Sequence, residues 1–205
     1  MIVDLNNWVL KRKNEEFYLK AKKLKCRSRS FFKLFEIQNK YNFLKKNMCV
    51  IDFGSSPGGW SELALKYVGS GGYILSIDRF IIENIFGVNF INGNINNKKF
   101  FNNIIYELKN KIVDVVISDI SPYIVGNKII DMCNIFYLAN IVLIFSKKKL
   151  KIHGNLLIKL FYGEGFDFYL NFLKNYFLKI YIIKPKSSIL TSLEVYAFCE
   201  NFSIV

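Results

Sequence analysis

The segment CVIDFGSSPGGW at residues 49–60 constrains the fold more than any other part of the chain. Its first five residues predict a buried β-strand, and the glycines and proline that follow predict a tight loop that opens a helix. A strand, a glycine-rich loop and a helix in this order are typical of doubly wound α/β sheets, which bind ligands at the carboxyl ends of their strands. Because the loop lacks the GxGxxG spacing of a pyrophosphate cradle, it favours a nucleotide-type ligand without phosphates, such as S-adenosylmethionine.

The rest of the chain alternates short apolar runs with helical stretches, which predicts an α/β domain. The runs are rich in Val, Ile and Leu, a composition typical of parallel strands buried on both faces. We expect strands at residues 49–53, 73–77, 88–91, 113–118, 156–160, 180–183 and 194–198. We expect helices at residues 59–67, 98–109, 131–149 and 166–176, and no second domain.

Composition excludes several classes of protein. With 205 residues, 52% of them hydrophobic, the chain is neither a disordered tail nor a disulfide-stapled miniprotein. The best candidate for a membrane span, residues 132–146, is shorter than the roughly 20 residues required and predicts a buried helix. Four scattered cysteines and a single histidine predict no metal site. Without a secretory signal core, we expect a cytoplasmic location and no membrane.

Positive charge is concentrated near the N-terminus. The chain carries a net charge of +13, and residues 1–40 hold eleven Lys and Arg against four Asp and Glu. Phosphate contacts from such residues provide most of the nonspecific affinity for nucleic acids, so the asymmetry indicates a polyanionic partner. A bias toward AT-rich codons, which places lysine on surfaces, is the alternative explanation.

Polar residues follow three of the expected strands. Asp78 in SIDRF lies where an acidic residue of such folds accepts ribose hydroxyls. Asn94 in INGN follows the third strand, at a position suited to the adenine edge, and Asp119 ends the strand that precedes Pro122. Asp78 and Asn94 are also common turn residues, but the upstream glycine loop favours a ligand-binding interpretation of Asp78.

Two charged residues lie in apolar runs near the C-terminus. Lys159 lies within LLIKLF, where an ammonium is costly unless charged partners or a pocket receive it. Glu194 opens the final strand. If that strand lies antiparallel beside the fifth, Asp119, Lys159 and Glu194 converge at one edge of the sheet, an arrangement suited to proton transfer. A lysine at the edge of the sheet that reaches solvent is the alternative.

Five motifs, in order, resemble the FtsJ/RrmJ family of S-adenosylmethionine-dependent RNA 2'-O-ribose methyltransferases. They are RSRSFFKLFEIQ (27–38), DFGSSPGGWS, SDISP, IKLFYGEGFD (158–167) and KPKSSILTSLEVY (184–196). The resemblance spans nearly the whole chain. It implies a Rossmann-like class I methyltransferase fold, with a seven-stranded, mostly parallel sheet, an antiparallel last strand and helices on both faces.

The resemblance also implies the site residues. The family's catalytic tetrad corresponds to Lys33, Asp119, Lys159 and Glu194. Lys159 would deprotonate or orient the ribose hydroxyl, and the other three would position it. The implied cofactor-binding residues are Gly54, Gly58, Gly59, Trp60, Asp78, Asn94 and Asp119. Residues 1–41 would form a basic helical RNA-binding extension, with Lys22, Lys23, Lys25, Arg27 and Arg29 as phosphate contacts, and residues 48–205 the catalytic core.

The chain departs from the family pattern at two places. Asn94 stands where relatives commonly carry Asp, although its amide oxygen can still accept a hydrogen bond from an adenine amine. Relatives often carry arginines where this chain has Ile189, Thr191 and Leu193, so the basic rim that would face RNA is thinner here.

By the same resemblance, we expect a monomer that methylates a uridine in the A-loop of large-subunit ribosomal RNA, within the large ribosomal subunit. The alternatives are a methyltransferase of the tRNA anticodon loop and a noncatalytic RNA-binding factor of ribosome assembly. A mitochondrial or plastid location is the alternative to the cytoplasm.

Overall fold

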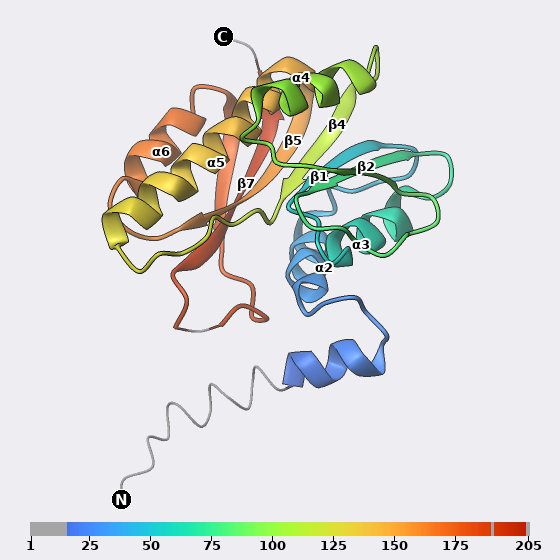
Figure 1. Cartoon of the computed structure of the whole chain (residues 1–205), viewed down its shortest axis with the longest axis horizontal. Helices are drawn as coiled ribbons and strands as arrows, with labels where there is room; N and C mark the ends of the chain where they lie inside the picture. The colour runs from blue at the N-terminus through green and yellow to red at the C-terminus, as the bar shows by residue number, and fades with distance from the viewer. Residues whose placement is uncertain (1–15, 190, 204–205) are drawn as a thin grey trace, which may run out of the picture.

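The computed structural model describes residues 16–189 and 191–203 and places a seven-stranded sheet at the centre of this part of the chain (Figure 1). In spatial order the strands are β3 (Asn89–Asn92), β2 (Tyr73–Asp78), β1 (Cys49–Phe53), β4 (Val113–Ser118), β5 (Leu150–Phe161), β7 (Glu194–Phe202) and β6 (Phe177–Ile183). Neighbours among β1 to β5 are parallel, whereas β7 is antiparallel to both β5 and β6. The predicted Rossmann-like sheet with an antiparallel last strand is confirmed.

Helices cover both faces of the sheet, as predicted. They are α2 (Ser30–Tyr41), α3 (Gly59–Val68), α4 (Lys98–Glu107), α5 (Lys128–Lys149) and α6 (Phe166–Leu173). Side chains of a strand alternate between its faces, and β1 divides the core accordingly. Ile51 and Phe53 pack with residues of α4, α5 and α6, while Val50 packs with residues of α2 and α3.

The helix α5 is the expected buried helix. By length and composition alone it could cross a membrane. However, five of its apolar side chains belong to the core between the helices and the sheet: Leu138, Ala139, Val142, Leu143 and Phe145. We therefore assign it as a core helix of the α/β fold.

Most elements differ in their bounds from the prediction, and only β1 and β4 match it at both ends. Three of the differences change how the chain is read. The helix α5 starts at Lys128 rather than at 131, because the Asn127 side chain caps it by accepting from the backbone N–H groups of Ile129 and Ile130. The strand β5 starts at Leu150 rather than at 156, since its polar stretch KIHGN hides the strand pattern. Residues 1–15 of the predicted basic helical extension lie outside the described part of the chain. In the described part the helix is interrupted: residues 16–23 are helical, a turn follows, and α2 begins at Ser30.

Candidate active site

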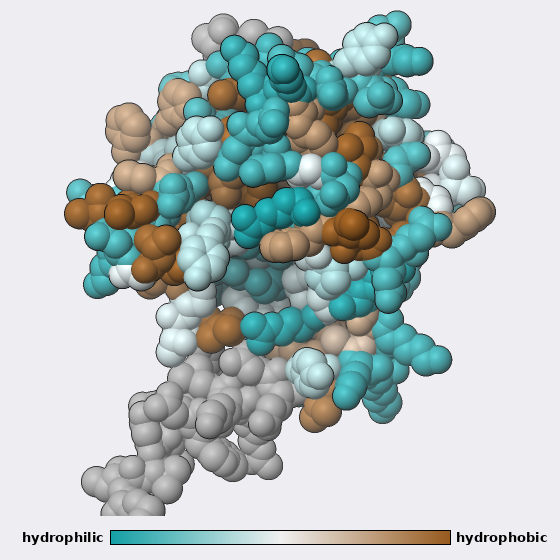
Figure 2. Space-filling model, in the orientation of Figure 1, coloured by the Kyte–Doolittle hydropathy of each residue, from teal (hydrophilic) through white to brown (hydrophobic). Residues whose placement is uncertain are grey.

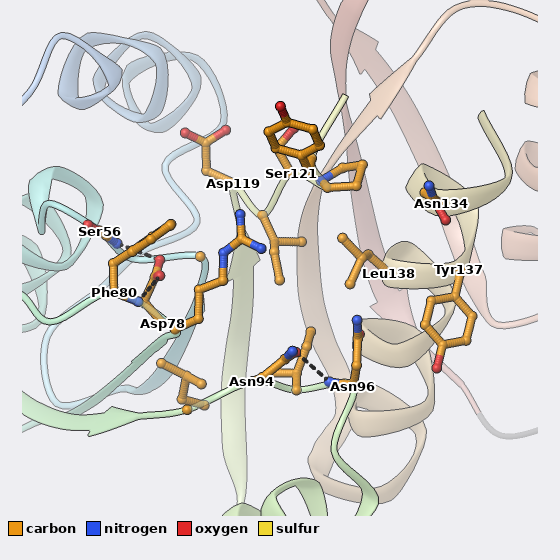
Figure 3. Close-up of a pocket in the computed structure, with 18 of the residues that line it drawn as sticks. Ser56, Asp78, Phe80, Asn94, Asn96, Asp119, Ser121, Asn134, Tyr137 and Leu138 are labelled. Carbon is orange, nitrogen blue, oxygen red and sulfur yellow. Dashed lines mark hydrogen bonds between the residues drawn. The ribbon is translucent and has the colours of Figure 1, made fainter. Parts of the chain in front are cut away.

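A cavity of about 470 Å³ lies at the carboxyl edge of the sheet (Figure 3). Residues after β1, β2, β3 and β4 line it, together with residues of α5. Four of the predicted cofactor-binding residues are among them: Gly54, Asp78, Asn94 and Asp119. Its volume falls in the usual range of small-molecule sites, roughly 300–1,000 Å³.

Gly54 allows two loops of the cavity to approach one another closely. Its φ is +77°, and a Cβ at this position would lie 2.5 Å from the Cα of Ile120. No residue with a side chain fits this contact without displacing the backbone. Glycine is therefore required here to pack the end of β1 against the segment that follows Asp119.

Asp78 is held in place at the end of β2. One carboxylate oxygen accepts a hydrogen bond from the backbone N–H of Ser56 at 2.9 Å, and the other accepts from the backbone N–H of Phe80 at 2.8 Å (Figure 3). Each oxygen keeps a second acceptor position. Asp78 is thus oriented in advance and able to accept ribose hydroxyls from a ligand in the cavity.

Asn94 lines the same cavity after β3, but its amide oxygen is already in use. It accepts a hydrogen bond from the backbone N–H of Asn96 at 3.0 Å (Figure 3). Since an amide oxygen has two acceptor positions, one is left for an adenine amine. Asn94 therefore combines the turn-forming and ligand-binding interpretations of the sequence.

Gly58, Gly59 and Trp60 have neighbours other than the predicted ligand. They are buried and do not line the cavity. A Cβ on Gly59 would lie 2.5 Å from the Ser28 Oγ, and the Trp60 Nε1 donates to the Ser30 carbonyl at 2.8 Å. These residues pack the start of α3 against Ser28 and the start of α2. The Trp60 ring, only 2% exposed, serves this packing, so ligand contact by these residues stays a prediction.

The four predicted catalytic residues converge as two ion pairs. The Lys159 Nζ donates to the Asp119 Oδ1 at 3.0 Å and to the Asp119 carbonyl at 2.5 Å. The Lys33 Nζ donates to the Glu194 Oε1 at 2.6 Å. The antiparallel pairing of β5 and β7 places Glu194 opposite Phe161, two residues beyond Lys159. The convergence expected from the sequence is confirmed.

Tyr196 connects the two ion pairs. Its hydroxyl donates to the Asp119 Oδ1 at 2.7 Å, and it lies 3.3 Å from both the Lys33 Nζ, which donates to it, and the Glu194 Oε1. Burial, followed by the nearby carboxylates, raises the pKa of Tyr196 well above 10, so it remains a neutral donor. The sequence prediction missed this residue. Its position two residues after Glu194, on the same face of β7, is the pattern that points to it.

Known proteins that are similar in sequence and structure show the family of this chain. A family model for FtsJ-like methyltransferases matches residues 26–202 of the chain. The chain belongs to this family. The chain is therefore a methyltransferase.

Individual FtsJ-like relatives extend over almost the same length. Proteins named ribosomal RNA large subunit methyltransferase E, from Francisella tularensis subsp. novicida and from Francisella philomiragia, are each 37% identical to this chain over 195 residues, which is 95% of both chains. A crystal structure of a Plasmodium falciparum protein described as a ribosomal RNA methyltransferase superposes with a TM-score of 0.76 and 34% identity. It covers 86% of this chain and 98% of its own.

Among the five basic residues of this FtsJ-like chain that are predicted to contact RNA, one has protein partners. Lys22, Lys23, Lys25 and Arg29 are exposed, and in Figure 2 hydrophilic side chains project from the region of the helical segment 16–23. Arg27 instead donates to the carbonyls of Glu83 and Asn84 at 3.0 and 2.9 Å. Its guanidinium therefore joins the segment to the loop after β2, and a phosphate contact by Arg27 stays a prediction.

Asp52 is a buried carboxylate next to the site that the sequence prediction left without a role. It is fully buried, and the Ser61 hydroxyl donates to one of its oxygens at 2.6 Å. The other oxygen has no hydrogen-bond partner among the described residues. Burial, with Asp119 and Asp78 nearby, raises the pKa of Asp52 to about 7.

Proposed function

We propose that this chain transfers a methyl group from S-adenosylmethionine to a ribose 2'-hydroxyl of large-subunit ribosomal RNA, with a uridine of the A-loop as the target. The observation that carries the proposal is the pair of linked ion pairs, Lys159 with Asp119 and Lys33 with Glu194, beside a cavity of suitable size. Membership of the FtsJ-like family and the names of the relatives support it.

The cavity fits the proposed cofactor. Asp78 and Asn94 supply acceptors for ribose and adenine at the ends of β2 and β3, and Asp119 lies at the end of β4. The loop from β1 to α3 offers no GxGxxG cradle, in keeping with a ligand that has no phosphate. When bound, S-adenosylmethionine supplies a methyl group on a positively charged sulfur, which is already an activated electrophile.

The protein's task is therefore to align the hydroxyl and to manage one proton. The Lys159 side chain is 7% exposed and fixed by two hydrogen bonds to Asp119, so its nitrogen has a defined position. Once the Lys159 ammonium has released a proton to solvent, the amine can accept the proton of the 2'-hydroxyl. The oxygen would gain the methyl group as the bond between that carbon and the cofactor's sulfur breaks. Asp119 then stabilises the resulting ammonium, while Lys33 and Glu194 orient the hydroxyl beside it.

Charge and family membership support the RNA substrate. The exposed residues Lys22, Lys23, Lys25 and Arg29 supply contacts for phosphates, which dominate affinity for nucleic acids. The names of the bacterial relatives support action on the large ribosomal subunit, and hence a cytoplasmic location. Action as a monomer is part of the same proposal and rests on no observation of its own.

The test is transfer of a tritiated methyl group to undermethylated large ribosomal subunits, free ribosomal RNA and tRNA in parallel, followed by mapping of the methylated ribose. Transfer to the large subunit alone, at one uridine of the A-loop, is the expected result. Transfer to tRNA alone contradicts the proposed substrate. Binding of RNA without transfer to any of the three contradicts the proposed activity.

A further inference from the structure

The helix α2 contacts the loop between β6 and β7 through two charged side chains one turn apart. Lys33 pairs with Glu194 at 2.6 Å, where the loop ends. Glu36 contacts the start of the loop: one carboxylate oxygen accepts from the backbone N–H of Lys186 at 2.7 Å, and the other accepts from that of Ser187 at 3.0 Å. One carboxylate thus binds two successive amides 150 residues away in sequence.

The residues that Glu36 binds lead directly to the tetrad. Ser188 follows them, is 4% exposed, and its hydroxyl donates to the Glu194 Oε1 at 3.0 Å. That oxygen is the one that accepts from Lys33. Lys184, just before the bound amides, donates to the carbonyls of Ser192 and Glu194. Residues of the first half of the loop, Lys184 and Ser188, therefore contact Glu194 at its far end.

The proposed reaction requires a fixed conformation of this loop, because the loop positions the Glu194 carboxylate. Glu194 opens β7, so the position of its carboxylate depends on how the preceding loop enters the strand. Displacement of a catalytic group by about 1 Å can cost on the order of 100-fold in rate. Hydrogen bonds from backbone N–H groups to a carboxylate are charge-assisted and roughly twice as strong as neutral ones.

We infer that Glu36 is a positioning residue of the methyltransferase: by binding the amides of Lys186 and Ser187 it fixes Ser188 and Glu194, and so assembles the Lys33–Glu194 pair before RNA binds. The inference rests on the proposed function for its catalytic consequence. The anchoring of the loop itself can be measured without activity.

The test uses Glu36→Gln, which keeps the shape of the side chain but replaces one acceptor oxygen with an NH₂ group that faces a backbone donor. Glu107→Gln is the matched control, because Glu107 is an exposed residue of α4, away from the cavity. Single-turnover methyl transfer at saturating RNA, cofactor affinity by calorimetry, and hydrogen exchange of the 186 and 187 amides are measured for each protein. Glu36→Asp, which retains the carboxylate, serves if Glu36→Gln does not fold.

We expect Glu36→Gln to slow transfer by about 10- to 100-fold, with cofactor affinity unchanged and both amides exchanging faster. For Glu36→Asp, the transfer rate and the exchange of the two amides lie between those of Glu36→Gln and the wild type. For Glu107→Gln, both match the wild type. In a Glu194→Gln background, Glu36→Gln adds less than about threefold, because both changes act through the same carboxylate.

Three results overturn the inference. Transfer by Glu36→Gln within about twofold of the wild type, despite faster exchange of the two amides, shows that the anchored loop does not govern the reaction. If Glu36→Gln slows methyl transfer in the Glu194→Gln background as much as it does in the wild type, Glu36 acts by a route other than Glu194. If the wild type transfers no methyl group, the proposed function fails, while unchanged exchange in Glu36→Gln or Glu36→Asp independently refutes the anchoring.

Discussion

Replacement of Lys159 by methionine tests the proposed chemistry most directly. Methionine has nearly the same length and shape, so the change removes the amine and its two hydrogen bonds to Asp119 without opening a large gap. Proton transfer by a positioned side chain contributes about 10²- to 10⁴-fold, or about 3–5 kcal/mol of the activation barrier. We predict a loss of single-turnover rate of that size or larger.

Other properties of this variant are expected to change little. Lys159 does not line the cavity, so cofactor affinity stays within about threefold, as measured by calorimetry. Asp119 keeps its hydrogen bond from Tyr196 and is partly exposed, which limits the loss of unfolding free energy to about 1–3 kcal/mol. Urea denaturation measures that loss and shows whether the variant is folded under assay conditions.

Lys151→Met is the matched control. Lys151 lies on the same strand, near its other end, and pairs with Asp114 at 2.5 Å. The substitution removes a lysine of β5 from an ion pair but leaves Lys33, Asp119, Lys159 and Glu194 unchanged. The rate of methyl transfer should therefore match that of the wild type. If Lys159→Met transfers methyl groups within about tenfold of the wild-type rate, Lys159 does not manage the proton and our reasoning is wrong.

Three further predictions concern the surroundings of the site. Because the pKa of Asp52 is raised to about 7, native protein binds its proton more tightly than unfolded protein does; unfolding free energy should therefore fall as pH rises from about 4 to 7, and urea titrations should show a smaller fall in Asp52→Asn. Changing Lys22, Lys23 and Lys25 together to Gln should weaken RNA binding and reduce its slope against log salt by about 0.7–0.9 per lost phosphate contact, as measured by filter binding, while cofactor affinity stays constant. Asn94→Ala should weaken cofactor binding several-fold in calorimetry; unchanged affinity would remove Asn94 from the site.

The tetrad could be predicted from sequence because it depends on strand order. Asp119 and Glu194 adjoin strand ends, and Lys159 lies on β5 beside the antiparallel β7, so topology alone brings them to one edge. Only the family motif indicates that Lys33 belongs to the same site. Nothing in the local pattern of α2 tells which of its side chains meet β7.

The contacts that the prediction missed depend on packing between distant segments. Glu36 and Tyr196 act through hydrogen bonds to residues far along the chain, and such partners have no local sequence pattern. Arg27 and Trp60 matched family motifs, but the path of the turn before α2 gives them protein partners. The basic, helix-favouring composition of this segment predicts a continuous helix and does not indicate the turn.

The position of β7 in the sheet has a consequence for folding on the ribosome. This strand comes after β6 in sequence but lies between β5 and β6, and β6 pairs with no other strand. During synthesis β6 must wait without a partner until β7 emerges, and the edge of β5 stays open for the same period. Glu194 and Tyr196 arrive with that final strand. A nascent chain can therefore form the cavity at the carboxyl ends of β1 to β4 before the predicted catalytic residues are assembled.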